Sequence, residues 1–98
     1  MSWYTFKLHR DAGYVSVHQG LELKYKLPYG GNRLTRGWTN HVLDVLIGKD
    51  SAYSLLAKSI TAQKDIPDKK IGLLIPPMYH VSSLRPSLWQ RVRNFFQL

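Results

Sequence analysis

The sequence predicts an α+β domain: a three-stranded antiparallel meander, a helical pair, one further strand and a C-terminal covering helix. Apolar and polar residues alternate through the first third of the chain, which is the period of half-buried strands. Apolar residues recur at helical spacing in the middle of the chain and again near its end. With 98 residues, the chain is long enough for a single small domain, 1–98.

The first two strands are predicted from alternation and from the turns that bound them. Tyr4, Phe6 and Leu8 alternate with polar neighbours, and a turn over residues 10–13 ends in glycine. Val15 and Val17 then share one face of the next strand, which ends at Gln19-Gly20. These two segments therefore predict a hairpin.

The third strand is predicted over residues 21–27. Its apolar residues, Leu21, Leu23, Tyr25 and Leu27, are expected on the inner face, with Lys24 and Lys26 on the outer face. Residues 28–33 follow as a loop, because they contain a proline, two glycines and an asparagine.

Two helices are predicted next. Trp38, Val42 and Leu46 are spaced four residues apart, with Thr39 or Asn40 as the N-cap and Gly48 at the C-terminal end. A second helix is expected to begin at Asp50 or Ser51 and to place Leu55, Leu56 and Ile60 on one face. The connection is so short that the helices must be antiparallel or sharply bent.

The last third predicts a polar turn over residues 65–70, a short buried strand over Ile71–Ile75 that Pro76 ends, and a final helix. The helix begins near Pro86 or Ser87, where Ser87-Leu-Trp-Gln90 has the form of a capping box. Its apolar stripe consists of Leu88, Trp89, Val92, Phe95 and Phe96.

Charge is the most informative functional feature. The net charge is +8, and two stretches, residues 23–43 and 69–98, contain basic residues without any acid. Such a charge attracts polyanions, so nucleic acid, an acidic protein and an anionic membrane surface all remain partners to consider. An ordinary solvated basic surface is the alternative.

A nucleic-acid-binding face is predicted across the meander and the loop that leaves it. Basic residues interleaved with aromatic ones on a sheet suit a single strand, through phosphate contacts and base stacking. Tyr14 and His18 are expected on the exposed side of the neighbouring strand. The residues predicted to contact nucleic acid are Lys7, Lys24, Lys26, Arg33 and Arg36.

The C-terminal helix is the candidate for a protein partner. Its aromatic stripe can dock on the domain's own sheet, fill the groove of another protein or lie in a membrane interface. The residues predicted to contact a partner are Trp89, Arg91, Arg93, Phe95 and Phe96.

Enzymatic motifs are not evident. The chain contains no cysteine, which excludes disulfides, thiolate ligands and a cysteine nucleophile. Its four histidines have no metal-ligand spacing, and no GxSxG or Walker pattern occurs. A metal-free ribonuclease would need side chains such as His9, Tyr14, His18, Arg33 and Arg36 to converge, although their spacing is not diagnostic.

We therefore expect a non-enzymatic protein that binds nucleic acid or belongs to a nucleoprotein assembly, without a cofactor or a metal. A viral or phage-type accessory or assembly protein that docks through the C-terminal helix is the alternative, and a small toxin-like ribonuclease is the third interpretation. The N-terminus is too polar for a signal peptide and no apolar run could span a bilayer, so we expect an intracellular, soluble, cytoplasmic protein. Oligomers are compatible with this interpretation.

Overall fold

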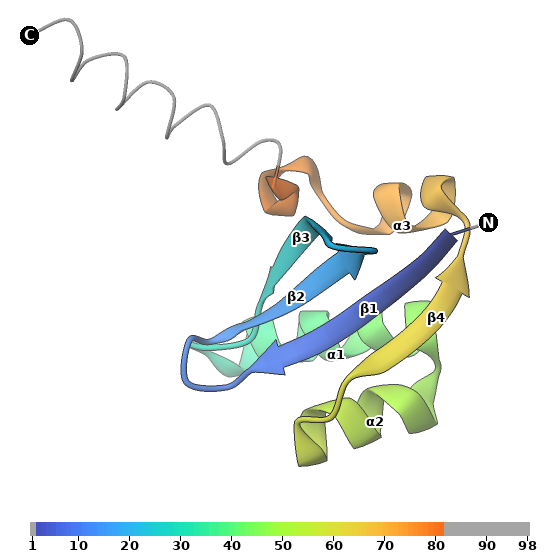
Figure 1. Cartoon of the computed structure of the whole chain (residues 1–98). Coiled ribbons are helices and arrows are strands. Elements are labelled where there is room, and N and C mark those ends of the chain that lie inside the picture. Colours follow the sequence, from blue (N-terminus) through green and yellow to red (C-terminus); the bar gives the residue numbers. More distant parts are fainter. Residues whose placement is uncertain (1, 82–98) are drawn as a thin grey trace, which may run out of the picture.

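The computed structural model describes residues 2–81 of the chain and confirms the α+β class (Figure 1). An antiparallel sheet of four strands is combined with three α-helices and one 3-10 turn. In chain order the elements are β1 (Ser2–His9), β2 (Tyr14–Gln19), β3 (Glu22–Pro28), α1 (Arg33–Ile47), α2 (Lys49–Lys58), β4 (Ala62–Ile66), α3 (Asp68–Leu74) and η1 (Pro77–Tyr79).

The sheet has the strand order β3-β2-β1-β4, so the meander supplies three neighbouring strands and β4 adds to the free edge of β1. Phe6 lies opposite Val17 on β2 and opposite Ala62 on β4, which places these three residues on the same face. Tyr4, Phe6, Leu8, Val15 and Val17 are buried on this face, as their alternation predicts. The helices cover it, and we call it the covered face.

The third strand departs from the predicted pattern. Its register with β2 shifts between Val17 and His18, so Tyr25 pairs with Val17 and Leu23 pairs with His18. The bulge uses Lys24 as the extra residue and puts Leu23 on the opposite face from Leu27. The prediction of one inner apolar face from Leu21 to Leu27 is therefore wrong, and Leu21 is fully exposed in the turn before the strand.

Two glycines bring the first hairpin against the loop that leaves β3. Gly13 has φ of +77°, a conformation that side chains with a Cβ rarely adopt. Its carbonyl accepts hydrogen bonds from the amides of Tyr29 and Gly30, at 2.8 and 2.9 Å. A Cβ on Gly30 would lie 3.3 Å from the Gly13 Cα, so this close approach favours glycine at both positions.

Helices α1 and α2 cover one end of the covered face (Figure 1). The first helix begins earlier than predicted: Asn32, not Thr39 or Asn40, caps it by accepting a hydrogen bond from the Thr35 amide at 2.9 Å. Thr39 is instead buried, and its hydroxyl donates to the Pro28 carbonyl. Gly48 ends α1 as predicted and precedes α2 directly.

The region after α2 contains the largest difference from prediction. Ala62–Ile66, whose last two residues belong to the predicted turn 65–70, is the strand β4, and its antiparallel partner is β1. The predicted strand Ile71–Ile75 is wrong: Ile71 lies within helix α3, which ends at Leu74, and Ile75 is its C-cap. Ile71 and Ile75 are four residues apart, so one helical face buries both against the covered face.

One hydrophobic core joins all of these elements. It lies between the covered face and the three helices, with half-buried Trp38 and Tyr79 at its border, their ring centroids 5.2 Å apart. The buried hydrophobic residues are Tyr4, Phe6, Leu8, Val15, Val17, Leu27, Val42, Leu43, Leu46, Ile47, Ala52, Leu55, Ala62, Ile66, Ile71 and Ile75.

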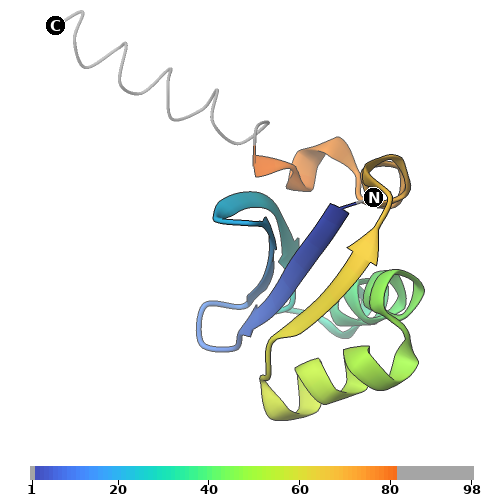
Figure 2. The same ribbon diagram turned by 45° about the vertical axis from the view of Figure 1, so that its right-hand side comes forward.

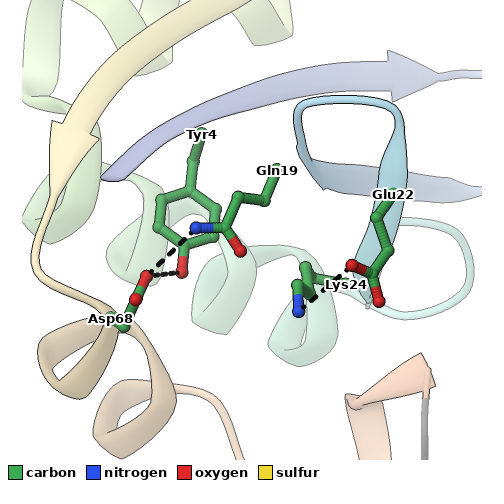
Figure 3. A network of polar contacts seen from close by, with 5 residues as sticks. All are labelled: Tyr4, Gln19, Glu22, Lys24 and Asp68. Atoms are coloured by element: carbon green, nitrogen blue, oxygen red, sulfur yellow. Dashed lines mark hydrogen bonds and ion pairs between the residues drawn. The ribbon is translucent and has the colours of Figure 1, made fainter. Parts of the chain in front are cut away.

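A polar network closes the end of the core beside α3 (Figure 3). The Tyr4 hydroxyl donates to Asp68 Oδ1, and burial together with this bond raises the pKa of Tyr4. The same hydrogen bond, followed by one from Ser2, lowers the pKa of Asp68. Lys24 forms an ion pair with Glu22 at 3.4 Å beside these residues and also contributes to the lowered pKa of Asp68.

No helix within residues 2–81 is both long enough and apolar enough to cross a membrane.

Candidate functional site

The second face of the sheet is free of helices over the described residues, and we call it the open face. In Figure 1 it is turned toward the viewer, with α1 behind the sheet and α2 below it; the turned view of Figure 2 again shows the helices to one side of the strands. The side chains on this face are mostly polar, cationic or aromatic. They include Trp3, Lys7, His9, Tyr14, Ser16, His18 and Lys26.

Ser16 lies at the centre of the open face. It pairs with Lys7 across β1 and with Lys26 across β3, so a lysine stands on each side of it. His18 follows two residues later on the same strand, and His9 lies diagonally across from Ser16 on β1. Directly paired residues have Cβ atoms about 4.5–5.5 Å apart, so these five residues form one group. We call His9, Ser16, His18, Lys7 and Lys26 the Ser16 cluster.

The Ser16 hydroxyl holds both imidazoles. Its Oγ lies 2.8 Å from Nε2 of His9 and 2.9 Å from Nε2 of His18, and it donates to the Lys7 carbonyl at 3.4 Å. A hydroxyl has one proton to donate and two lone pairs. Because Ser16 donates its one proton to the Lys7 carbonyl, it can only accept hydrogen bonds from the two rings. Both rings must therefore donate their Nε2–H to Ser16.

This assignment determines the state of the other ring nitrogens. In the neutral rings, Nδ1 of His9 and of His18 carries a lone pair, and in the charged rings it carries a proton. No hydrogen bond within residues 2–81 uses either Nδ1. The bond of each ring to Ser16 therefore leaves its Nδ1 unused.

The cluster is strongly electropositive. Burial is the main cause that lowers the pKa of His9, and the charges of Lys7, His18 and Lys26 lower it further. The Tyr14 ring stacks on the His9 ring with centroids 4.5 Å apart, and Lys26 Nζ lies 4.2 Å from the centre of the Tyr14 ring. Tyr14 thus orients both a histidine and a lysine of the cluster.

An exposed aromatic side chain extends the open face toward the N-terminal end of β1. Trp3 is 64% exposed, and it lies on the same strand face as Thr5, which pairs with His18. Its partner on β4 is Asp65, the only acidic residue on this face among the strands within residues 2–81. An indole left in solvent beside a cationic cluster offers a surface on which a nucleobase can stack.

The structure brings together only part of the predicted nucleic-acid-binding set. Lys7 and Lys26 share the open face on either side of Ser16. Lys24 lies at the bulge and pairs with Glu22 near Asp68 (Figure 3). Arg33 and Arg36 are exposed in the first turns of α1, in the helix layer.

The sequence did not indicate the Ser16 cluster as a unit. The sequence predicts His18 beside Tyr14 on the nucleic-acid-binding face and includes His9 and His18 in the ribonuclease interpretation, but it does not single out Ser16. Alternation alone places the strand residues on one face, but their adjacency depends on the hairpin register. The hairpin turn at Gly13 was the available signal, because it pairs His9 with Tyr14 and Lys7 with Ser16.

The other candidates are separate from the cluster. His41 is exposed on α1, and His80 bonds to the Ile75 carbonyl at 2.8 Å. Within residues 2–81, no group of three or more histidine and acidic side chains is arranged to hold a metal ion. The predicted partner-binding residues of the C-terminal helix, 89–96, lie outside the described residues, so that interpretation stays a prediction.

Surface depressions also lie among the helices of the described residues, away from the Ser16 cluster. The first runs between α1 and α2 and is lined by Asn40, Asp44, Lys49 and Tyr53 among others. The second is a shallow apolar patch on α3 with Leu73 and Leu74, beside Lys69 and Lys70. Neither gathers proton-transfer groups as the Ser16 cluster does.

Comparison with protein-family models, with curated proteins and with solved structures finds no match to this chain. The residues and their geometry alone therefore indicate a function.

Proposed function

We propose that this protein binds single-stranded nucleic acid on the open face of its sheet. The observation that carries the proposal is the Ser16 cluster, in which two lysines and two histidines surround one buried hydroxyl. Phosphates that lie over this cluster would be neutralised by the ammonium groups and would accept hydrogen bonds from them. Ser16 is only 1% exposed beneath the two imidazoles, so a phosphate would contact the longer side chains around it and not its hydroxyl.

A single strand suits this face better than a duplex. Bases of a single strand are free to stack on aromatic side chains, and Trp3 is exposed beside the cluster for this purpose. Lys7 and Lys26 would hold neighbouring phosphates, and recognition would be tolerant of sequence because stacking and charge contacts serve any base.

The test measures binding of the full chain to labelled single-stranded RNA, single-stranded DNA and the matching duplexes over a salt series. We expect single strands to bind more tightly than duplexes. The double variant Lys7→Gln and Lys26→Gln should make the slope of log affinity against log salt shallower by about 1.4, since each phosphate contact contributes about 0.7 on a single strand.

The matched control changes Lys49 and Lys58 to Gln on α2, which removes the same charge from the helix layer. If binding depends on the open face, this control should keep the salt slope nearly unchanged. Equal loss in both double variants would mean that only net charge matters, and absence of binding to every probe would overturn the proposal.

A further inference from the structure

The Ser16 cluster contains more than binding requires. Phosphate contacts need cations, and Lys7 and Lys26 supply them, yet two imidazoles are also held against one oxygen. Because Nε2 of both rings lies within hydrogen-bond distance of Ser16 Oγ, the two imidazoles are close neighbours on the same face. Imidazole is the side chain most often used to transfer protons in catalysis near neutral pH.

We propose that His9 and His18 cleave RNA bound on the open face, by transferring protons to and from the phosphodiester held beside Ser16. This inference rests on the proposed binding function and adds a reaction to it. The substrate class is single-stranded RNA, because the reaction uses the 2′-hydroxyl that DNA lacks.

The reaction balances without a further reactant. Nδ1 of one neutral imidazole removes the proton of the 2′-hydroxyl, and the 2′ oxygen forms a bond to the adjacent phosphorus. The bond from phosphorus to the 5′ oxygen of the next nucleotide breaks. Nδ1–H of the other, charged imidazole gives its proton to that leaving oxygen. The products are a 2′,3′-cyclic phosphate and a 5′-hydroxyl.

The environment of His9 assigns the role of base to this ring, which leaves the role of acid to the other imidazole. Burial, and then the charges of Lys7, His18 and Lys26, lower the pKa of His9 and favour its neutral form, so His9 suits the base. His18 then supplies the proton to the leaving oxygen. Lys7 and Lys26 would stabilise the negative charge that grows on the phosphate oxygens during the attack.

Ser16 is a positioning residue in this scheme. At 1% exposure its hydroxyl is too buried to attack a phosphate. Because it donates its own proton to the Lys7 carbonyl, it accepts Nε2–H from both rings and makes no use of their Nδ1 atoms. Tyr14, stacked on His9, limits the rotation of that ring. Holding both groups before the substrate binds is what an acid–base pair needs for catalysis.

The experiment incubates the full chain with single-stranded RNA labelled at its 5′ end, over a range of pH. We expect internal cleavage with products that end in a 2′,3′-cyclic phosphate. The pH profile of the unaltered protein should be bell-shaped, because one imidazole must be neutral and the other charged. The same strand with 2′-O-methyl groups should bind and remain intact.

The variants His9→Gln and His18→Gln should each lower the rate at least about 100-fold, the lower range for a lost proton-transfer group. Glutamine keeps a donor for Ser16, and circular dichroism checks the fold. The control His41→Gln alters an exposed histidine on α1 and should cleave like the unaltered protein. All variants are purified identically. Cleavage that persists in the double variant, in which both His9 and His18 are changed to Gln, identifies a contaminant and overturns the inference.

The possible failures are distinguishable. RNA that is bound but stays intact at every pH would overturn the cleavage inference while the binding proposal stands. RNA that is not bound at all would overturn both.

Discussion

The two faces of the sheet carry opposite kinds of residue on the same strands. On β1, Tyr4, Phe6 and Leu8 are buried in the core, while Trp3 and Lys7 are exposed on the open face. On β2, Val15 and Val17 contribute to the core, while Ser16 between them holds two imidazoles. The covered face therefore builds the core, and the open face places polar, cationic and aromatic side chains outside it.

The difference between the two faces is tested most directly by removing one side chain from each of them. Phe6→Ala deletes a fully buried ring, and we expect the free energy of unfolding to fall by about 3–5 kcal/mol. Thr5→Ala, its neighbour on the open face, should change it by no more than about 0.5 kcal/mol. Urea denaturation of both variants measures the difference. Similar losses for the two would mean that the open face is part of a core.

Trp3→Ala tests whether the open face binds through stacking as well as charge. We expect the affinity for single strands to fall by about 1–3 kcal/mol, the usual contribution of one stacked base. The salt slope should stay the same, because no cation is removed. Tyr53→Ala is the control, since Tyr53 is a comparably exposed aromatic residue on α2. Anisotropy titrations would contradict the proposal if both variants bound alike.

Tyr4→Phe tests how much the polar network at the end of the covered face stabilises the fold. The substitution removes the hydroxyl that bonds Asp68, so the pKa of Asp68 should rise toward its ordinary value. A carboxyl group with a lowered pKa stabilises the fold above its unfolded pKa, and this contribution is lost as the pH falls through the folded pKa. The variant should melt at a lower temperature at pH 7 and differ less from the unaltered protein in acid.

Open-face binding should be insensitive to Tyr4→Phe, because Asp68 and Tyr4 belong to the opposite side of the sheet. A lower affinity for single strands in this variant would show that the two faces are coupled.

The smallest expected effect is the pH dependence that His9 gives to the free energy of unfolding and to the affinity for a single strand. Because folding lowers the pKa of His9, this residue binds a proton less readily in the folded chain than in the unfolded chain, where its pKa is about 6.5. The free energy of unfolding should therefore decline as the pH falls below about 6.5. Affinity for a single strand should change in the opposite direction and increase, because a bound phosphate favours the charged imidazole.

His9→Gln should flatten both pH profiles, and thermal melts and binding titrations between pH 5 and 8 would measure them. A profile that His9→Gln leaves unchanged would mean that other groups cause the dependence.

Local pattern was enough for the elements that repeat it clearly. The alternation in residues 4–8 and 15–17 predicted β1 and β2 with the correct inner faces, because one side of each strand must be buried. Gly13 and Gly48 marked a turn and a helix end, since both adopt positive φ. The helical pair followed from the four-residue spacing of Trp38, Val42 and Leu46.

Local pattern was not enough where partners far along the chain determine the conformation. Ala62–Ile66 is apolar only at its ends, and it is a strand because it pairs with the free edge of β1. The run Ile71–Ile75 fits a strand or a helix equally well by composition. It begins in a helix because this geometry buries Ile71 and Ile75 together while Leu73 remains 78% exposed.

The α+β class, the meander, the helical pair and the basic charge all follow from local patterns in the sequence. Which basic residues lie side by side depends on how the strands pair in the folded chain. The bulge at Lys24 turned one lysine toward Glu22, and the hairpin register placed Lys7 and Lys26 beside Ser16. Side-chain periodicity assigns a residue to a face, but pairing between strands assigns its neighbours, and a site is made of neighbours.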